Sequence, residues 1–228
     1  MSGRARPIRT VAIDGPAGAG KSTLARALAA HLGLERLDTG AMYRAVAWAA
    51  LQRAVDPHDA EAVGALARGL RIEVGESGSG GAETVLVDGD DATAGIRSAT
   101  VDATVSAVAA NPAVRATMVE RQQAWVARHG GGVVEGRDIG TVVLPDADVK
   151  VYLTAHTEQR ARRRAAERGR AHDVAAIAAA LDRRDTLDST RTISPLPIGP
   201  GQVPADAIVV DSTDKAAGDV LQEVLAWL

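Results

Sequence analysis

Short apolar runs along this chain alternate with stretches in which apolar residues recur every three or four positions. The run Thr10–Asp14 leads through several glycines to Leu24, Leu28 and Leu32, which predicts a strand, a glycine-rich turn and a helix. Three later runs are apolar enough for buried strands: 133–135, 149–153 and 206–211. Further helices are predicted at 22–32, 40–53, 60–68, 101–108, 112–125, 157–168, 173–190 and 214–228. Such alternation predicts a parallel sheet covered on both faces, with a ligand site at the carboxyl ends of its strands.

The pattern changes between residues 70 and 97. Two short runs, Leu70–Val74 and Glu83–Val87, flank a loop rich in glycine and serine, and Asp88–Asp91 is typical of a turn. We therefore expect a small antiparallel insertion at 70–97. Residues 1–69 and 98–228 would then form the core of a three-layer α/β protein, with a helical lid at about 157–172.

Composition excludes several classes of protein. With 228 residues, 46% of them hydrophobic and 24% charged, the chain is typical of one globular domain with a modest insertion. A net charge of -3 gives no overall basic field for nucleic acid. There is no cysteine, and no apolar stretch of signal-peptide length precedes the first strand. We expect a cytoplasmic monomer that acts on small molecules, without nucleic acid or membrane partners.

The turn after the first strand carries the most specific local motif. Residues Gly15–Ser22 fit the pattern G-x-x-x-x-G-K-[ST] at every position. In this phosphate-binding loop (P-loop), backbone N–H groups face the phosphates of ATP, lysine reaches the β- and γ-phosphates, and the hydroxyl binds Mg²⁺. The predicted ATP-binding residues are Gly15, Pro16, Ala17, Gly18, Ala19, Gly20, Lys21, Ser22 and Thr23, with Lys21 also catalytic and Ser22 a metal ligand.

A P-loop predicts a bound nucleotide but leaves the reaction open. A GTPase would need an N-K-x-D string that reads guanine, and the chain has none. Large NTPase machines need more elements than 228 residues leave room for. Small kinases remain, and the acceptor side must distinguish among them.

Two strings mark the acceptor side, Asp38–Arg44 (DTGAMYR) and Glu135–Thr141 (EGRDIGT). Together with IDGPAGAGKST, NPAVR, EGRDIGTVVLPDADVK, RRDTLDSTR and ADAIVVDST, they give nearly the whole chain a close resemblance to the bacterial cytidylate kinases. The insertion at 70–97 resembles the enlarged CMP-binding region of that family. The resemblance implies a P-loop kinase that transfers the γ-phosphoryl group of Mg-ATP directly, in line, to CMP and dCMP.

The resemblance also implies roles for individual residues. Cytosine would be read by Ser106, Arg115 and Asp138, because a carboxylate accepts from the exocyclic amine that uracil lacks. The acceptor phosphate would be held by Arg44, Arg137 and Arg191, and the ribose by Arg184 and Asp188. Thr39 and Tyr43 belong to the same substrate region, and Arg137 would also be catalytic. Glu135 would hold Mg²⁺ from a position where many relatives have aspartate.

The predicted lid helix carries four arginines between residues 160 and 164. Arg160 and Arg164 lie four positions apart and share one face, so we expect them to cover the donor phosphates, with Arg163 next. These three are the remaining predicted catalytic residues. The alternative for this helix, and for the trio Arg184, Asp188 and Arg191, is a solvated face with surface ion pairs.

Three other functions stay open from sequence. A kinase that prefers UMP is the nearest. A P-loop kinase for a metabolite such as shikimate or gluconate would lack the set of residues that reads a base. A regulatory protein that binds nucleotide would turn over ATP slowly, whatever nucleoside monophosphate was present.

Overall fold

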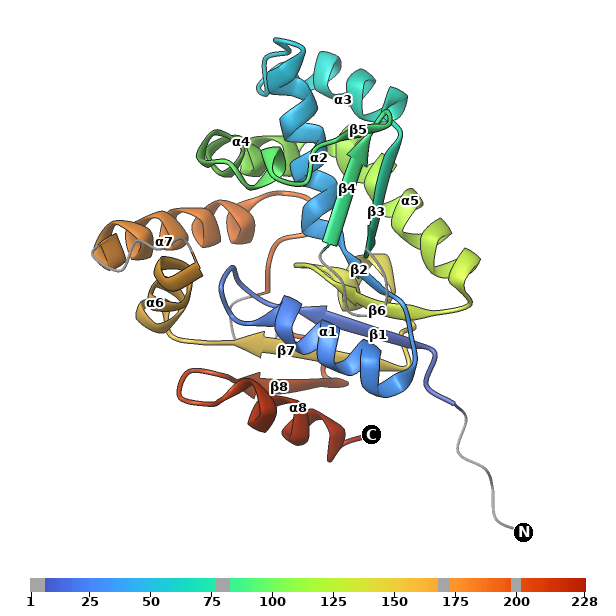
Figure 1. Ribbon diagram of the computed structural model, residues 1–228, viewed down its shortest axis with the longest axis vertical. Helices are drawn as coiled ribbons and strands as arrows, with labels where there is room; N and C mark the ends of the chain where they lie inside the picture. Colours follow the sequence, from blue (N-terminus) through green and yellow to red (C-terminus); the bar gives the residue numbers. More distant parts are fainter. Residues whose placement is uncertain (1–6, 77–82, 168–172, 198–201) are drawn as a thin grey trace.

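The computed structural model describes residues 7–76, 83–167, 173–197 and 202–228. Its main sheet has five parallel strands in the order β2-β6-β1-β7-β8 (Figure 1). The strands are β1 (Thr10–Asp14), β2 (Arg36–Asp38), β6 (Gly132–Glu135), β7 (Val149–Thr154) and β8 (Ala207–Asp211). The predicted parallel sheet is confirmed, and β1 lies at its centre.

Helices join these strands, and four of them begin at a polar side chain that caps the first turn. Asp38, Asp59, Ser98 and Asn111 each accept a hydrogen bond from a backbone N–H of the helix that follows. The long helices are α1 (Lys21–Leu32), α2 (Thr39–Gln52), α3 (Ala60–Gly69), α4 (Ala99–Ala110), α5 (Pro112–His129), α6 (Thr157–Glu167), α7 (Val174–Thr190) and α8 (Ala217–Leu225). Two short helical turns are η1 (Gly95–Arg97) and η2 (Ile139–Val143).

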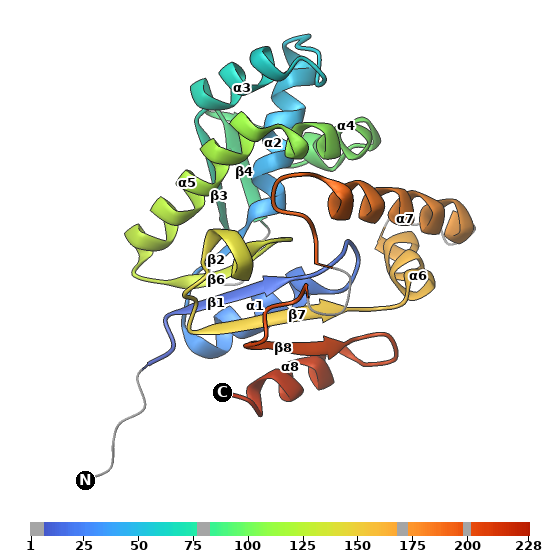
Figure 2. The same cartoon turned by 180° about the vertical axis from the view of Figure 1, so that it is seen from behind.

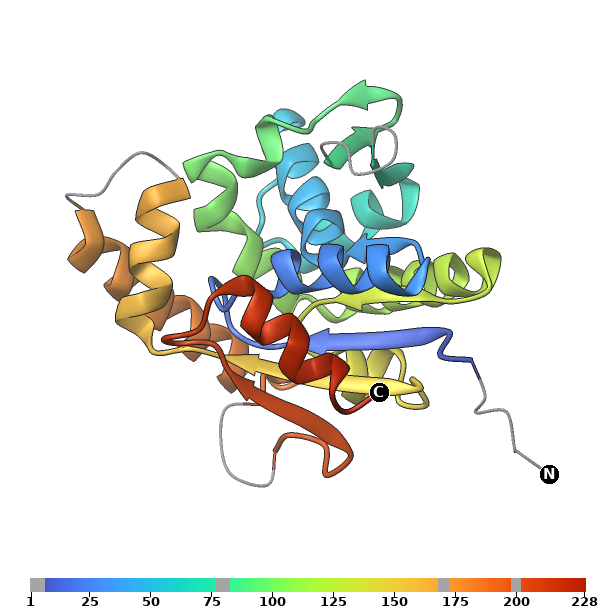
Figure 3. The same ribbon diagram turned by 60° about the horizontal axis from the view of Figure 1, so that its bottom comes forward.

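The sheet is buried on both faces, because successive strand residues point in opposite directions. Val11 and Ile13 of β1 pack in one core with α1 and α8, whereas Ala12 packs in a second core with α2, α4 and α5. Figure 3 shows α1 and α8 together on one side of the sheet. The result is the predicted three-layer α/β arrangement.

A second, antiparallel sheet packs against α2 in the α2–α5 part of the molecule (Figure 2). Its strands are β3 (Ile72–Glu76), β4 (Glu83–Val87) and β5 (Asp90–Asp91). Val85 and Val87 are buried in the same core as α2. The predicted turn over Asp88–Asp91 is correct only for its first half, because Asp90 and Asp91 pair with β4 as a third strand.

The predicted lid corresponds to α6 for residues 157–167, while 168–172 lie outside the described residues. α6 packs on α7 through a small cluster of its own: Ala161, Ala165, Ile177 and Leu181. In Figure 1, α6 and α7 stand at the side toward which the arrows of β1 and β7 point. The P-loop faces them from the carboxyl end of β1.

Candidate functional site

The P-loop wraps around the start of α1 and depends on glycine where backbone atoms come closest. Gly15 has φ of 147°, and a Cβ atom there would lie 2.0 Å from the carbonyl oxygen of Leu153 on β7. Lys21 is buried and donates from Nζ to the carbonyl oxygens of Gly15 and Pro16, at 2.8 Å each. Its ammonium therefore lies inside the loop, where phosphate oxygens bind in such motifs.

A pocket of about 320 Å³ opens over this loop. It is lined by Gly18, Ala19, Gly20, Lys21, Ser22, Thr23 and Leu24, and by Leu153, Arg163, Arg164, Glu167, Ser212, Lys215, Ala217 and Val220. The sequence predicted the P-loop residues of this lining, Gly18–Thr23, and the arginines Arg163 and Arg164. The residues from β8 to α8 were missed, because only the fold brings them beside the loop.

Three predicted ATP-binding residues, Gly15, Pro16 and Ala17, do not line this pocket. Their carbonyl oxygens instead accept hydrogen bonds from site cations. The oxygen of Gly15 accepts from Arg137 at 3.1 Å as well as from Lys21, and that of Ala17 accepts from Arg160 at 3.1 Å. This half of the loop holds the charged side chains in place.

Ser22 and Glu135 meet at the mouth of the P-loop. The Ser22 hydroxyl donates to Glu135 Oε2 at 2.8 Å, and Arg36 Nη1 donates to Oε1 at 3.1 Å. Burial, followed by the charge of Asp38, raises the pKa of Glu135 to about 7. Burial, followed by the charge of Arg137, lowers the pKa of Lys21 to about 7. Both groups are costly to keep charged until a ligand of opposite charge arrives.

The same pair suits Mg²⁺, a hard cation that prefers oxygen and usually takes one or two protein ligands beside phosphate and water. A hydroxyl and a carboxylate that touch one another beside a phosphate loop provide such ligands. In the part of the chain that the structure describes, no group of three or more His, Cys, Asp or Glu side chains could hold a metal alone. The donor set fits an ion shared with a bound phosphate.

Asp14 was not predicted as a site residue, yet it shapes the acceptor side. Its carboxylate accepts from the backbone N–H groups of Ile139 and Gly140, at 2.7 and 2.8 Å. Burial raises its pKa to about 6. Asp14 thereby ties the P-loop strand to the start of η2, directly after Asp138.

The three residues predicted to read cytosine lie on different elements that meet beside α2. Asp138 is buried and accepts a hydrogen bond from Arg115 Nη2 of α5. The Arg115 guanidinium lies over the ring of Tyr43, 5.6 Å from its centroid, and Nη1 donates to the carbonyl oxygen of Ala109 on α4. Ser106 lies half-buried one turn earlier on α4. The structure thus brings a buried carboxylate, a guanidinium and an aromatic ring together.

The predicted phosphate-binding arginines crowd around a few carboxylates. Arg137 Nε donates to Asp188 at 3.1 Å, Arg184 approaches the same carboxylate at 3.9 Å, and Arg191 lies 3.8 Å from Asp138. Burial, followed by the nearby charges of Arg137 and Arg44, lowers the pKa of Arg184 to about 10. Cations held so close to one another favour a bound anion.

Arg191 and Arg44, both predicted to hold the acceptor phosphate, have surroundings that the sequence did not indicate. α7 ends at Thr190, so Arg191 lies just beyond the face that Arg184 and Asp188 share, and still reaches Asp138. Arg44 pairs with Asp102 of α4 at 2.6 Å, a carboxylate that the sequence did not single out.

The lid arginines divide into two groups. Arg160 is buried, with Nη1 bound to Asp185 of α7 at 2.6 Å, and does not line the P-loop pocket. Arg163 and Arg164 do line it, and Arg163 donates to Ser212 Oγ at 3.0 Å. The shared face of Arg160 and Arg164 therefore does not determine which arginines reach the pocket.

Thr39 lies beside the site in a supporting position. Its hydroxyl donates to the carbonyl oxygen of Glu135 at 2.7 Å, which links the start of α2 to the end of β6. Tyr43 is buried one turn further along α2, and burial raises its pKa to about 12. Its hydroxyl therefore stays protonated at neutral pH.

The strand, glycine loop and helix, with a pocket of about 320 Å³ above them, define a P-loop nucleotide-binding protein of the α/β class. The cytidylate kinase family profile matches residues 11–228. The chain therefore belongs to the cytidylate kinase family, and the resemblance inferred from its motifs is confirmed.

Individual relatives agree. The chain is 48% identical over 217 residues to the cytidylate kinase of Mycolicibacterium paratuberculosis, covering 94% of this chain and 92% of that one. It is 48% identical over 218 residues to that of Rhodococcus opacus, with the same coverage. It is 54% identical over 190 residues to a bifunctional pantoate ligase/cytidylate kinase of Synechococcus sp., covering 82% of this chain and 38% of that one. An uncharacterized Eubacterium ventriosum protein shares the fold, with TM-score 0.54, 10% identity and coverage of 97% and 98%.

Among the residues that the structure describes, none of the helices has both the length and the apolar character that crossing a membrane requires.

Proposed function

We propose that this protein phosphorylates CMP, and dCMP as well, with ATP as phosphoryl donor. One observation carries the proposal: the buried pair of Asp138 and Arg115 lies next to Arg137, which contacts the P-loop itself. Arg137 joins the two sides, because it donates to Asp188 on α7 and to the P-loop carbonyl of Gly15. A base-reading pair, an anion site and a triphosphate site are thus contiguous.

On the donor side, Lys21 and the backbone of the P-loop bind the phosphates of ATP, and Arg163 and Arg164 line the same pocket. These cations neutralise charge that develops on the oxygens of the transferred group. Ser22 and Glu135 would hold Mg²⁺, which would help to neutralise the charge of the phosphates. Arg160 positions the loop through the carbonyl of Ala17 and its ion pair with Asp185.

On the acceptor side, Arg44, Arg137 and Arg191 hold the phosphate of CMP, while Arg184 and Asp188 hold the ribose. The acceptor oxygen already carries negative charge, so no strong general base is needed. The work of the site is to bring two polyanions into line against their repulsion. We further propose that α6 and the small sheet close over the nucleotides and exclude water, which would otherwise accept the phosphoryl group.

Asp138 supplies the choice of base. Its carboxylate accepts from the exocyclic amine of cytosine, whereas uracil would present a carbonyl oxygen and leave two acceptors facing each other. A site built to pair a polar group rejects an analogue that leaves the group unpaired. This argument favours CMP over UMP, and a metabolite kinase would have no use for the pair. That the protein works as a cytoplasmic monomer stays a prediction from its composition.

The proposal is tested by following ATP and CMP with the enzyme and Mg²⁺ by ³¹P NMR. The expected result is that ADP and CDP signals grow at equal rates, with no inorganic phosphate beyond that of a sample without CMP. Formation of ADP and inorganic phosphate without CDP would show an ATPase instead and would overturn the proposal.

A further inference from the structure

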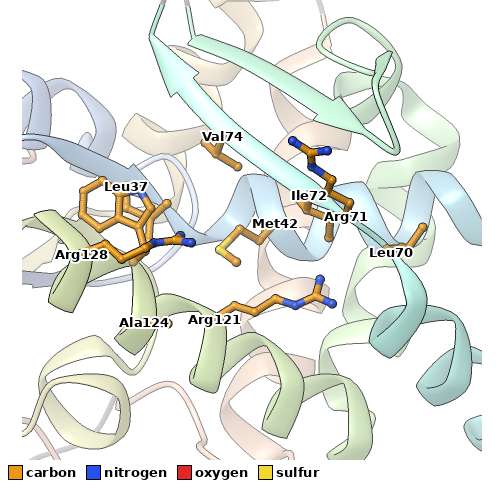
Figure 4. A pocket seen from close by; sticks show the side chains of 10 residues that line it. Leu37, Met42, Leu70, Arg71, Ile72, Val74, Arg121, Ala124 and Arg128 are labelled. Carbon is orange, nitrogen blue, oxygen red and sulfur yellow. The ribbon is translucent and has the colours of Figure 1, made fainter.

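A second pocket, of about 360 Å³, lies between β2, α2, α5 and β3 with the two residues before it. It shares no lining residue with the pocket over the P-loop. Its walls are Leu37, Met42, Leu70, Arg71, Ile72, Val74, Arg121, Ala124, Trp125 and Arg128, and we call it the α5–β3 pocket (Figure 4). Its volume lies within the range of sites for small organic molecules, about 300–1,000 Å³.

The floor of the α5–β3 pocket is apolar and its rim is basic. Its apolar lining includes the half-buried Trp125 beside the buried Leu37 and Met42, and the charged residues among the described ones that line it are all arginines. Figure 4 shows Arg121 and Arg128 extending from α5, with Arg71 on the opposite rim. An apolar floor under several arginines is complementary to a flat apolar ligand that carries an acidic group.

These arginines have donors to spare. Arg121 Nη2 donates to the carbonyl oxygen of Arg68 at 3.1 Å, while its Nη1 is buried with no partner among the described residues. Within that same part of the chain, Arg128 makes neither an ion pair nor a hydrogen bond. Arg71 pairs with Glu73 at 2.8 Å, but the Arg71 side chain is 78% exposed, so the pair is weak. An acidic ligand would therefore displace little, and it would give the unpartnered Nη1 of Arg121 an acceptor.

We propose that the α5–β3 pocket is a binding site for a small aromatic anion. The ring system lies over Met42, Leu37 and Trp125, and the acidic group is held by Arg121 and Arg128. Guanidinium groups suit both phosphate and carboxylate, which they bind in a bidentate manner. The proposal does not rest on the kinase reaction, because the site is separate from the P-loop and from the arginine cluster around Asp188.

The test uses the indole N–H signals of the three tryptophans, Trp48, Trp125 and Trp227, in a ¹⁵N-labelled sample. The probes are 1-naphthyl phosphate, 1-naphthoate and the neutral 1-naphthalenemethanol, added with CMP and ADP present to occupy the kinase site. The Trp125 signal, assigned with Trp125→Phe, is expected to shift and saturate with both anions. The neutral compound is expected to bind at least tenfold more weakly. Tighter binding of the phosphate than of the carboxylate would identify a dianion site.

Variants separate this site from adventitious binding. The double variant Arg121→Gln and Arg128→Gln is expected to weaken the anions at least tenfold and to leave the neutral compound unchanged. Arg26→Gln, on the exposed face of α1, is the matched control and should change nothing. Thermal unfolding of each variant verifies that it is folded. A Trp125 signal that does not move or saturate, equal affinity for the neutral compound, or unaltered affinity in the double variant would overturn the proposal.

Discussion

Replacing Asp138 by asparagine removes one charge from the proposed base-reading pair and keeps its shape. Arg115 and Asp138 have side chains only 3% and 6% exposed, so water cannot take over the lost partner. Leaving one member of a buried ion pair uncompensated costs about 3–5 kcal/mol. The asparagine oxygen still accepts from Arg115, so we expect a smaller loss, about 2–3 kcal/mol of unfolding free energy. For a domain of this size that corresponds to roughly 4–12 °C in melting temperature.

The effect on catalysis should be selective. Asparagine accepts from the cytosine amine more weakly than a carboxylate, and its own amide can donate to the uracil oxygen. The variant exchanges a charged hydrogen bond to cytosine for a neutral one and removes the repulsion toward uracil. Together these changes should reduce the free-energy preference for CMP over UMP by about 1.4–2.8 kcal/mol. The ratio of kcat/KM for CMP over UMP should therefore fall by about 10- to 100-fold. The assay is steady-state ADP release with each acceptor, below the melting temperature of the variant.

Asp185→Asn provides a matched control. Asp185 and Arg160 form another poorly exposed ion pair, at 2.6 Å, on the side of α7 that meets the P-loop. Loss of this ion pair should lower stability and slow phosphorylation of both acceptors alike, so the ratio of kcat/KM for CMP over UMP should stay unchanged. If Asp138→Asn lowers stability as expected but keeps the ratio within about threefold, which is under 1 kcal/mol, Asp138 is a structural residue and the reasoning on base choice fails.

Three further predictions concern the donor side. Gly15→Ala should prevent stable folding, because the new Cβ atom would lie 2.0 Å from the Leu153 carbonyl oxygen. The control is Gly33→Ala, whose Cβ atom would have no atom within 4 Å, and it should lower the free energy of unfolding in denaturant by only about 1 kcal/mol. Mg²⁺-dependent ADP affinity, measured by calorimetry, should fall up to about tenfold per pH unit below 7, because a proton competes with the metal for Glu135, whose pKa is raised to about 7. Glu135→Gln should abolish this pH dependence. A pH dependence that persists in the variant would assign it to another group. Arg163→Ala should reduce kcat about 100-fold with little change in melting temperature, and full rescue by lysine would argue against a bidentate phosphate contact.

Parts of the fold followed from local signals in the sequence. The P-loop and α1 were predicted because the glycines, lysine and following apolar spacing fix one backbone path. β2 was missed because it has three residues, two of them charged, and so offers no apolar run. Within that strand, Arg36 pairs with Glu135, and Asp38 caps α2.

The site was predictable where a motif names its residues, and less so where distant elements meet. Asp14 looks like the end of a strand, and its contact with η2 bridges 125 positions of sequence. Ser212 enters the donor pocket from the position just after β8, and although the string ADAIVVDST contains it, that string names no role for it. Helical spacing grouped Arg160 with Arg164, but Asp185 on a neighbouring helix holds Arg160 away from the pocket. Spacing on one helix does not reveal which acid a second helix supplies.

The proposed reaction of this site is transfer of a phosphoryl group to a cytosine nucleotide. The most direct measurement is the rate of ADP release from Mg-ATP with CMP, dCMP, UMP, AMP, GMP, shikimate or gluconate added singly, each compared with ATP alone. CMP and dCMP should stimulate release at least tenfold more than any other acceptor, the ratio expected for one lost polar contact to the base. Equal stimulation by UMP, stimulation only by a sugar acid or shikimate, or none at all would contradict it.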